Sequence, residues 1–439
     1  MLDQCLGGSN MNQSVHLAYG REGRTFDMPA HAELTLLRKS VAAMRGDPQS
    51  RVLAALASPV DAAPIRKEAR GARTACIVIC DVTRPVPNGL LLRPIIDELV
   101  AGGVPLTGIC ILVATGLHRP NEGAELAELI GDPWVTAHVR IENHDARRDE
   151  DHIDLGQTEA RKTPIILDRR LVEADVRIVT GLVEPHFMAG YSGGRKVIAP
   201  GVAHHTTIRT FHSARFMEHP AARTCNLAGN PLHEEQLAIV AALGRALAVN
   251  VVLSDERDLV HVNYGEVVAS HAASVEVAAG LSEVSVPRRF STVVTSAAGY
   301  PLDRTYYQTV KGMVTPLDIL EPGGTLIIAA DCGEGLGSPD YRAAQEQLLA
   351  LGQDAFVSGL EAKALADVDE WQTEMQVKST RRADVALYSE ALGDDHSLTG
   401  VRRIDDVCDA VAQSIARTGD NAVAVIPEGP YVVPFCRQT

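Results

Sequence analysis

Four polar segments of the chain carry residue types that do acid–base chemistry or bind anions. The longest runs from Gly181 to Lys196 and continues to His212, with His186, a glycine-rich turn and the adjacent cations Arg195 and Lys196 along it. Glycine lets the backbone approach a ligand closely, and histidine supplies a base or a metal ligand near neutral pH. This combination is more typical of a functional site than of a hydrophobic core.

The other three segments are shorter, and they hold cations and histidines near the ends of predicted strands. They are Asp81 to Arg84, Gly116 to Arg119 around His118, and Tyr300 to Lys311. In open α/β sheets ligands bind beyond the carboxyl ends of the strands. We therefore expect the first three segments to line one rim and the fourth to face it from a second domain, giving an interdomain cleft.

Each of these residues also has a purely structural interpretation. Asp81 and Arg84 could simply pair with each other in a βα turn, or Arg84 could hold a phosphate or carboxylate by a forked hydrogen bond. His118 could be a loop histidine that caps a helix, or an acid/base group. From the residues alone, a buried histidine is the default for His212. Surface exposure is the default for two further histidines, His204 and His205.

Two familiar motifs are excluded by their spacing. The sequence around Ser192 matches G-x-S-x-G, but a nucleophile elbow needs a strand that ends just before the serine, and the predicted strand 176–180 ends well before it. The Gly-Gly-Arg-Lys run ending at Lys196 lacks the spacing of a P-loop. A serine hydrolase and a P-loop nucleotide-binding protein are therefore disfavoured.

The composition is that of an ordinary globular protein of two domains. The chain has 439 residues, of which 46% are hydrophobic and 22% charged, with a formal net charge of −15. No basic patch indicates nucleic acid, and no apolar run indicates a membrane helix. Because the first 14 residues lack a signal sequence, we expect a flexible leader and a cytoplasmic protein. The eight cysteines show no C-x-x-C pair, so reduced, mostly buried thiols are expected.

The order of elements predicts an α/β fold of two domains with mainly parallel, helix-covered sheets. Short apolar runs at 74–80, 106–114, 176–180, 249–253, 290–295, 324–330 and 383–388 are typical of buried strands, and helical spacing lies between them. We assign 1–14 to the leader, 15–285 plus 421–439 to an N-terminal cofactor-binding domain and 286–420 to a C-terminal domain. The charged stretch 147–154 is predicted to be a solvated loop.

Taken together, the polar blocks resemble the nickel-dependent lactate racemase family, whose members racemise or epimerise 2-hydroxy acids. The resemblance extends from about Asp81 to Trp371 and rests on the order and spacing of its blocks: Asp81-Val82-Thr83-Arg84-Pro85-Val86-Pro87, Thr115-Gly116-Leu117-His118-Arg119-Pro120, Asn143-His144-Asp145, and Glu184-Pro185-His186 through Gly190-Tyr191-Ser192-Gly193-Gly194-Arg195-Lys196. It implies nickel and a nickel-pincer nucleotide, pyridinium-3-thioamide-5-thiocarboxylic acid mononucleotide, as the cofactor.

The resemblance also implies a role for individual residues. Lys196 matches the lysine to which the nucleotide is attached covalently, and His212 matches the histidine that completes the coordination of nickel. His118 and His186 match the two acid/base histidines.

Further residues match the surroundings of the cofactor and the substrate. Arg84 would help to hold the nucleotide phosphate, Asp81 would orient groups around it, and Ser192 and Gly193 of the turn are expected at the cofactor. From the C-terminal domain, the matching positions are Tyr307, Gln308, Lys311 and Trp371, which would bind the substrate; Gln308 and Lys311 are also counted as catalytic.

The predicted function is therefore inversion at C2 of lactate or a related 2-hydroxy acid by hydride transfer to the lysine-tethered nucleotide. One histidine would remove the hydroxyl proton and the opposite histidine would return it. Expected partners are the small-molecule substrate and the cofactor-synthesis proteins that load the chain, with no nucleic acid or membrane. The alternative is a non-catalytic binder or carrier of the nickel nucleotide or of a phosphorylated small molecule, which would not need two histidines.

Overall fold

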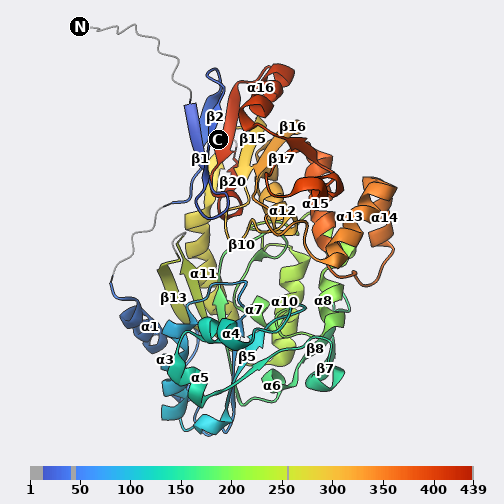
Figure 1. The fold of residues 1–439 in the computed structure, drawn as a ribbon. Coiled ribbons are helices and arrows are strands. Elements are labelled where there is room, and N and C mark those ends of the chain that lie inside the picture. The colour runs from blue at the N-terminus through green and yellow to red at the C-terminus, as the bar shows by residue number, and fades with distance from the viewer. Residues whose placement is uncertain (1–12, 41–45, 255–256, 438–439) are drawn as a thin grey trace, which may run out of the picture. The chain divides into compact units, whose positions relative to one another are not determined.

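The structure, a computed structural model, describes residues 13–40, 46–254 and 257–437. The chain forms two compact units (Figure 1). Unit 1 consists of the described residues within 1–39, 282–360 and 367–439. Unit 2 consists of those within 40–281 and 361–366. Each unit has its own six-stranded sheet. The predicted α/β class is confirmed, whereas the expected cleft between the domains stays a prediction.

Unit 2 is built around a sheet with the strand order β13-β12-β9-β4-β5-β6. Its strands are β4 (Ala75–Cys80), β5 (Ile109–Ala114), β6 (Arg140–Asn143), β9 (Val176–Leu182), β12 (Leu247–Leu253) and β13 (Leu259–Glu266). Neighbouring strands are parallel, except that β12 and β13 are antiparallel. Every residue of β4 and of β12 is buried, as continuous apolar runs predict for strands covered on both faces.

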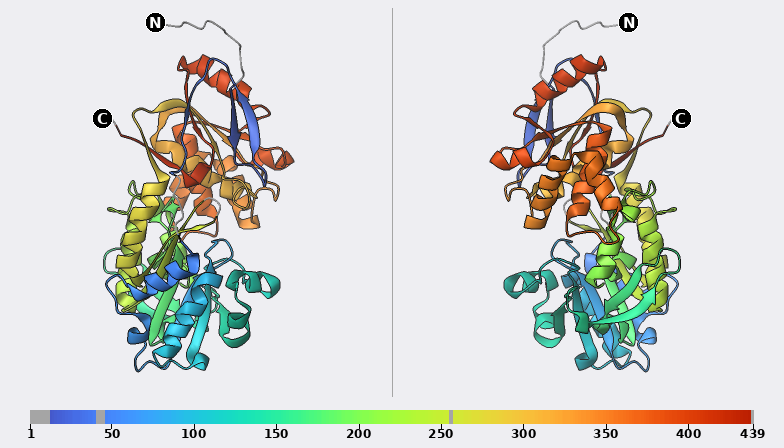
Figure 2. Two further views of the ribbon diagram at one scale, coloured as in Figure 1. Left: turned by 90° about the vertical axis from the view of Figure 1, so that its left-hand side faces the viewer. Right: turned by 90° about the vertical axis from the view of Figure 1, so that its right-hand side faces the viewer.

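Helices cover both faces of this sheet. Its longer helices are α1 (Pro48–Ala57), α3 (Asn88–Ala101), α10 (Pro231–Leu243) and α11 (Val267–Ser282), and Figure 2 shows α1 and α3 on one side of the sheet and α10 and α11 on the other. The shorter helices are α2 (Ile65–Glu68), α4 (Gly123–Ile130), α5 (Pro133–His138), α6 (Arg169–Val172), α7 (Arg195–Ile198), α8 (His205–Phe211) and α9 (Ala214–Met217). Local sequence signals set several starts, because Asn230 caps α10 and Asp132 caps α5, each followed by proline.

Two small antiparallel pairs complete unit 2. They are β7 (His152–Gln157) with β8 (Pro164–Asp168), and β10 (Pro185–His186) with β11 (Gly190–Tyr191). The first pair corrects the expectation of a loop over 147–154, because that stretch contains a 3₁₀ turn, η2 (Asp149–Asp151), and the first residues of β7.

Unit 1 contains a fully parallel sheet with the order β18-β17-β16-β15-β19-β3. Its strands are β3 (Glu33–Leu36), β15 (Phe290–Ser296), β16 (Leu320–Ala329), β17 (Asp384–Tyr388), β18 (Arg402–Ile404) and β19 (Ala422–Ile426). Its α-helices are α12 (Tyr306–Val314), α13 (Pro339–Leu351), α14 (Gln353–Glu361), α15 (Glu370–Arg382) and α16 (Val407–Thr418). Two strand pairs lie outside the sheet. They are an antiparallel hairpin of β1 (Gln13–Leu17) and β2 (Arg24–Met28), and a parallel pair of β14 (Glu283–Val286) and β20 (Val433–Cys436). The hairpin and α16 share a buried apolar cluster with the sheet.

The strand pairing corrects the predicted domain boundaries. Strand β19 lies between β15 and β3, so residues 15–39 and 421–437 group with the C-terminal domain and not with the N-terminal one. The apolar run of β19 predicts a buried strand, but it carries no information on which sheet receives the strand. Of the predicted leader, residues 1–12 lie outside the described residues, and 13 and 14 begin β1.

Within the described residues, no helix has the length and apolar character needed to cross a membrane. The seven cysteines for which the structure gives a state are free thiols, and four of them are buried.

Candidate active site

The ends of β4 and β5 place a carboxylate against a histidine. Asp81, the first residue after β4, is 5% exposed, and its Oδ2 lies 2.7 Å from Nδ1 of His118 in the loop after β5. Its Oδ1 accepts hydrogen bonds from the hydroxyl and the amide of Thr83. Burial alone would raise the pKa of Asp81, but the hydrogen bond and charge of His118 outweigh it and lower that pKa. The imidazole of His118 is itself exposed.

Arg84 points its guanidinium at an acidic residue from another strand end. It pairs with Glu184, which follows β9, and both side chains are about three-quarters buried. The possible ion pair between Arg84 and Asp81 is therefore not the one that forms. Glu184 stands in the Glu-Pro-His block, but nothing in the spacing of the residues matches it with Arg84.

His186 is held on the short β10–β11 hairpin, where it pairs with Gly190. Its Nδ1 accepts hydrogen bonds from the amides of Met188 (3.3 Å) and Ala189 (3.2 Å). In the neutral ring these contacts assign the proton to Nε2. The ring also stacks on Phe187, with centroids 5.1 Å apart. The hairpin thus holds the backbone that carries this imidazole.

Ser192 and the two following glycines form a tight turn against the sheet. The Ser192 hydroxyl donates to the carbonyl of Leu182 (2.7 Å) and is buried, which agrees with the exclusion of a serine nucleophile. Gly193 and Gly194 have φ values of +82° and +46°, and a Cβ on Gly193 would come within 2.5 Å of Val183. The turn therefore requires glycine for its conformation and for space.

Arg195 joins this turn to the helices behind it. The residue is fully buried; its Nε donates to Nδ1 of His233 (2.6 Å) and its Nη1 contacts Nε2 of His271 (2.7 Å). Its Nη2 donates to the carbonyls of Ala189 and Tyr191. Burial lowers the pKa of Arg195 to about 9. Sequence reasoning did not assign this role to Arg195, because its partners lie far along the chain.

Lys196 and His212 lie near each other within unit 2. Lys196 is the second residue of α7 and His212 is the residue at which α8 ends. Nδ1 of His212 donates to the carbonyl of Ile208 (2.8 Å), which leaves Nε2 with a lone pair. Burial, helped by the charge of Lys196, lowers the pKa of His212 to about 4. His212 is therefore a neutral imidazole at physiological pH, the form in which histidine binds a metal.

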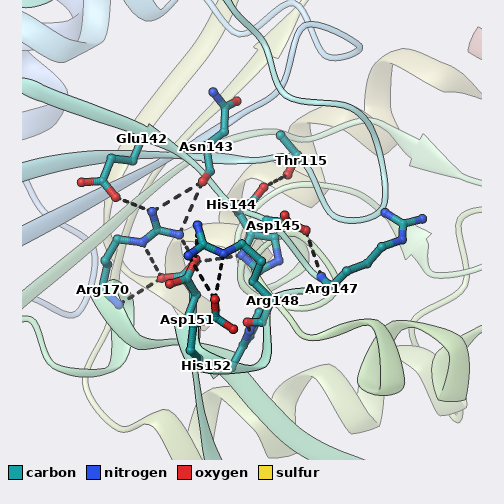
Figure 3. A network of polar contacts seen from close by, with 12 residues as sticks. Thr115, Glu142, Asn143, His144, Asp145, Arg147, Arg148, Asp151, His152 and Arg170 are labelled. Atoms are coloured by element: carbon teal, nitrogen blue, oxygen red, sulfur yellow. Dashed lines mark hydrogen bonds and ion pairs between the residues drawn. The ribbon is translucent and has the colours of Figure 1, made fainter.

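The Asn143-His144-Asp145 block takes part in a network of polar contacts around His144, which is buried (Figure 3). Nδ1 of His144 lies 2.8 Å from Oδ2 of Asp168, and its Nε2 lies 3.0 Å from the carbonyl of Ala203. Both partners, a carboxylate and a backbone carbonyl, are hydrogen-bond acceptors. Arg170 also binds Asp168 and reaches Glu142. The network ties the strand ends to the segment that leads into α8 and His212.

The candidate substrate residues of unit 1 gather around α12. Trp371 donates from Nε1 to the hydroxyl of Tyr307 (3.3 Å), and Gln372 donates to the Tyr307 carbonyl (2.6 Å). Gln308 and Lys311 lie three residues apart on α12 and so share one side of the helix. The Oε1 of Gln308 is buried and has no hydrogen-bond partner, which is unusual for a side-chain amide oxygen.

The structure thus brings some predicted residues together within each unit. In unit 2 Asp81 meets His118, and Lys196 lies close enough to affect His212; in unit 1 Tyr307 meets Trp371. Three residues were missed that hold these groups in place, namely Glu184, His233 and His271. In the sequence each of them is marked only as a polar residue within an otherwise apolar or helical stretch. A solvent-exposed residue would give the same pattern.

Comparisons with known proteins agree on the family. The profile of the lactate racemase N-terminal domain matches residues 19–225, and that of the lactate racemase C-terminal domain matches residues 287–433. The chain is 28% identical over 436 residues to a lactate racemase of Thermoanaerobacterium thermosaccharolyticum, covering 96% of this chain and 99% of the relative. It is 31% identical over 395 residues to a lactate racemase of Lactiplantibacillus plantarum, covering 88% and 90%.

Among solved structures, the lactate racemase apoprotein from Thermoanaerobacterium thermosaccharolyticum superimposes with a TM-score of 0.88 at 26% identity, covering 96% of this chain and all of that one. A Thermotoga maritima protein shares the fold alone, with a TM-score of 0.63 at 18% identity over 89% of this chain and 99% of that one. The chain belongs to the lactate racemase family. It is a racemase, an isomerase that acts on a small molecule, and membership of this family implies a nickel-based cofactor.

Proposed function

We propose that the chain racemises lactate or a related 2-hydroxy acid, using a nickel-pincer nucleotide attached to Lys196. The observation that supports this most is the juxtaposition of Lys196 with His212, whose Nε2 lone pair and pKa of about 4 suit a metal ligand. The glycine turn just before Lys196 packs closely against Val183 and His271, so it would present the lysine from a fixed backbone. The residues present therefore fit the cofactor.

The chain's own residues would hold the cofactor as follows. Lys196 would carry the nucleotide and His212 would ligate nickel. Arg84 would bind the phosphate, and since it pairs with Glu184, the phosphate would share or replace that partner. Ser192 and Gly193 would shape the turn beside the nucleotide. When bound, the cofactor would accept a hydride from C2 of the substrate and return it.

His118 and His186 would move the hydroxyl proton. Because Nδ1 of His118 faces the Asp81 carboxylate, its Nε2 keeps the lone pair and is ready to act as a base. Nδ1 of His186 accepts from backbone amides, so this ring must change its orientation or its tautomer before Nε2 can accept a proton. Asp81 would stabilise the imidazolium that forms when His118 takes the proton.

The substrate carboxylate would be bound by Lys311, with Tyr307 and Trp371 beside it. The buried Oε1 of Gln308 lacks a hydrogen-bond partner and would accept a hydrogen bond from the substrate.

The tether is tested by the mass of the intact protein after co-expression with cofactor-synthesis enzymes. Wild type should carry the nucleotide and nickel, and Lys196→Ala should have the unmodified mass. Lys162→Ala is a matched control, because Lys162 is an exposed lysine of the same unit; it should be modified like wild type. An adduct that persists in Lys196→Ala would place the tether on another residue.

A further inference from the structure

A second group of potential metal ligands lies at the opposite end of α8 from His212. Asp149 of η2, His204 and His205 each offer a ligand atom, and these atoms lie within 4.8 Å of one another. Nε2 of His204 is 2.9 Å from Oδ1 of Asp149, and the two imidazole centroids are 4.1 Å apart. The expectation that both histidines are exposed is wrong for His204, which is 8% exposed, and His205 is partly buried.

The donor set has the chemistry of a divalent transition-metal site. Two imidazole nitrogens and one carboxylate oxygen are ligands that Zn²⁺ accepts in tetrahedral sites, with a water in the fourth position. Asp149 is exposed, so that water has access, and the carboxylate offsets the positive charges of Arg147 and Arg209 near His205. A site with two imidazoles also selects against Mg²⁺ and Ca²⁺, which prefer oxygen ligands.

A neighbouring histidine has a polar atom that lacks a partner. His152 is 6% exposed, and its Nδ1 lies 2.8 Å from the carbonyl of Arg148, to which it donates. Its Nε2 therefore keeps a lone pair, and that atom is buried with no hydrogen-bond partner. The ring packs edge-on against His204, with centroids 4.9 Å apart. A buried acceptor without a partner beside a group of ligands is explained by a donor such as a metal-bound water.

We propose that Asp149, His204 and His205 bind a divalent transition-metal ion of the zinc class that links η2 to the start of α8. The backbone already brings these segments together, because the amide of His205 donates to the carbonyl of Ala146. Helix α8 rises about 10 Å between this site and His212, so the two metal sites are distinct. The ion would fix the helix that carries the nickel ligand.

Metal binding requires one rearrangement at His204. Its Nδ1 accepts a hydrogen bond from the amide of Thr206 (3.3 Å) at the start of α8, while Nε2 faces Asp149. Ligation through Nε2 moves the ring proton to Nδ1, and the long contact with Thr206 is lost. The ion then takes over the role of joining His204 to Asp149.

The test is a titration of the cofactor-free full-length chain with Co²⁺, followed by its visible ligand-field absorption and by competition with Zn²⁺. This proposal does not depend on racemase activity, so apo protein is sufficient. Wild type should bind one Co²⁺ with the intense band of a four- or five-coordinate site. His205→Gln and Asp149→Asn should each weaken binding by about 100-fold, at least the loss caused by removing an outer-shell partner.

Two controls separate this site from other histidines. His138→Gln removes an exposed histidine that contacts Trp134, and His212→Gln removes the proposed nickel ligand; both should keep the Co²⁺ band. Zn²⁺ should also raise the melting temperature of wild type but not of His205→Gln. Absence of the band in wild type, or equal Co²⁺ affinity in wild type and either cluster variant, would overturn the proposal.

Discussion

The hydrogen bond between Asp81 and His118 joins the ends of two neighbouring strands and selects the tautomer of the imidazole. With Nδ1 facing the carboxylate at 2.7 Å, Nε2 is the nitrogen that can exchange a proton with a ligand. A buried carboxylate keeps its charge here because His118 and Thr83 bind it. At the scale of single residues, His118 is thus the proposed base whose tautomer already suits proton transfer.

We expect Asp81→Asn to lower kcat/KM of the loaded enzyme by roughly 10- to 100-fold, less than the whole contribution of a general base. The asparagine keeps the shape of the side chain but loses the charge that stabilises protonated His118. Because two enantiomers have the same free energy, kcat/KM must fall equally in both directions. Progress curves from each pure enantiomer measure this.

Asp97→Asn is the control, since Asp97 forms an exposed ion pair with Arg93, and it should leave kcat/KM unchanged. If Asp81→Asn retained full activity while His118→Gln abolished it, Asp81 would not be the group that orients this histidine.

At the scale of elements, the turn at Gly193 and Gly194 determines where helix α7 begins after strand β9. Its backbone is locked by the Ser192 hydroxyl on one side and by Asn250, which accepts from the amide of Gly194 (2.9 Å), on the other. Buried Arg195 then anchors the turn to α10 and α11. The lysine that follows is therefore presented by a rigid segment.

Gly193→Ala should destabilise the protein by about 1–3 kcal/mol, the cost of a strained left-handed conformation, and the clash with Val183 adds to it. Gly280→Ala in α11 is the matched control, because a Cβ there meets nothing within 4 Å; it should be neutral or stabilise by up to about 1 kcal/mol. Urea unfolding of both variants gives the comparison. Equal stability of the two would show that the turn tolerates a side chain.

The Asp168 network makes stability depend on pH in the acid range. Burial would raise the pKa of Asp168, but Arg170 and His144 lower it from 3.8 to about 2. Because the pKa of the folded state is below that of the unfolded state, the stabilisation is complete above about pH 4 and is lost as the pH falls towards 2.

Asp168→Asn should therefore lower the free energy of unfolding at pH 7 by about 3–5 kcal/mol, the cost of leaving a buried charge without its partner. The difference in the free energy of unfolding between this variant and wild type should become smaller as the pH is lowered from 4 towards 2. Glu173→Gln, which removes an exposed partner of Arg169, should change the free energy of unfolding only slightly. A difference that is the same at every pH would mean that the effect comes from packing and not from charge.

At the scale of the whole molecule, the alternation of strands and helices was predictable because buried parallel strands are continuous apolar runs. It was not predictable which sheet contains β19, since the pairing of this strand with β15 and β3 depends on residues far along the chain. The contact of Asp81 with His118 was predictable in outline, because these residues follow the neighbouring strands β4 and β5. Two sets of contacts could not be predicted: the pairing of Arg84 with Glu184, and the anchoring of Arg195 by His233 and His271. The type of a polar residue does not indicate which distant residue it contacts in the fold.

Single-enantiomer lactate labelled with deuterium at C2 would show whether the loaded chain inverts C2 of a 2-hydroxy acid, as we propose. Wild type loaded with cofactor should convert either enantiomer to an equal mixture, seen by chiral chromatography, with the deuterium retained in the product. His118→Gln and His186→Gln should carry the same adduct but racemise at least about 100-fold more slowly. A fully loaded chain that leaves lactate and all other 2-hydroxy acids of a panel unchanged, or that exchanges the label with solvent, would contradict the account.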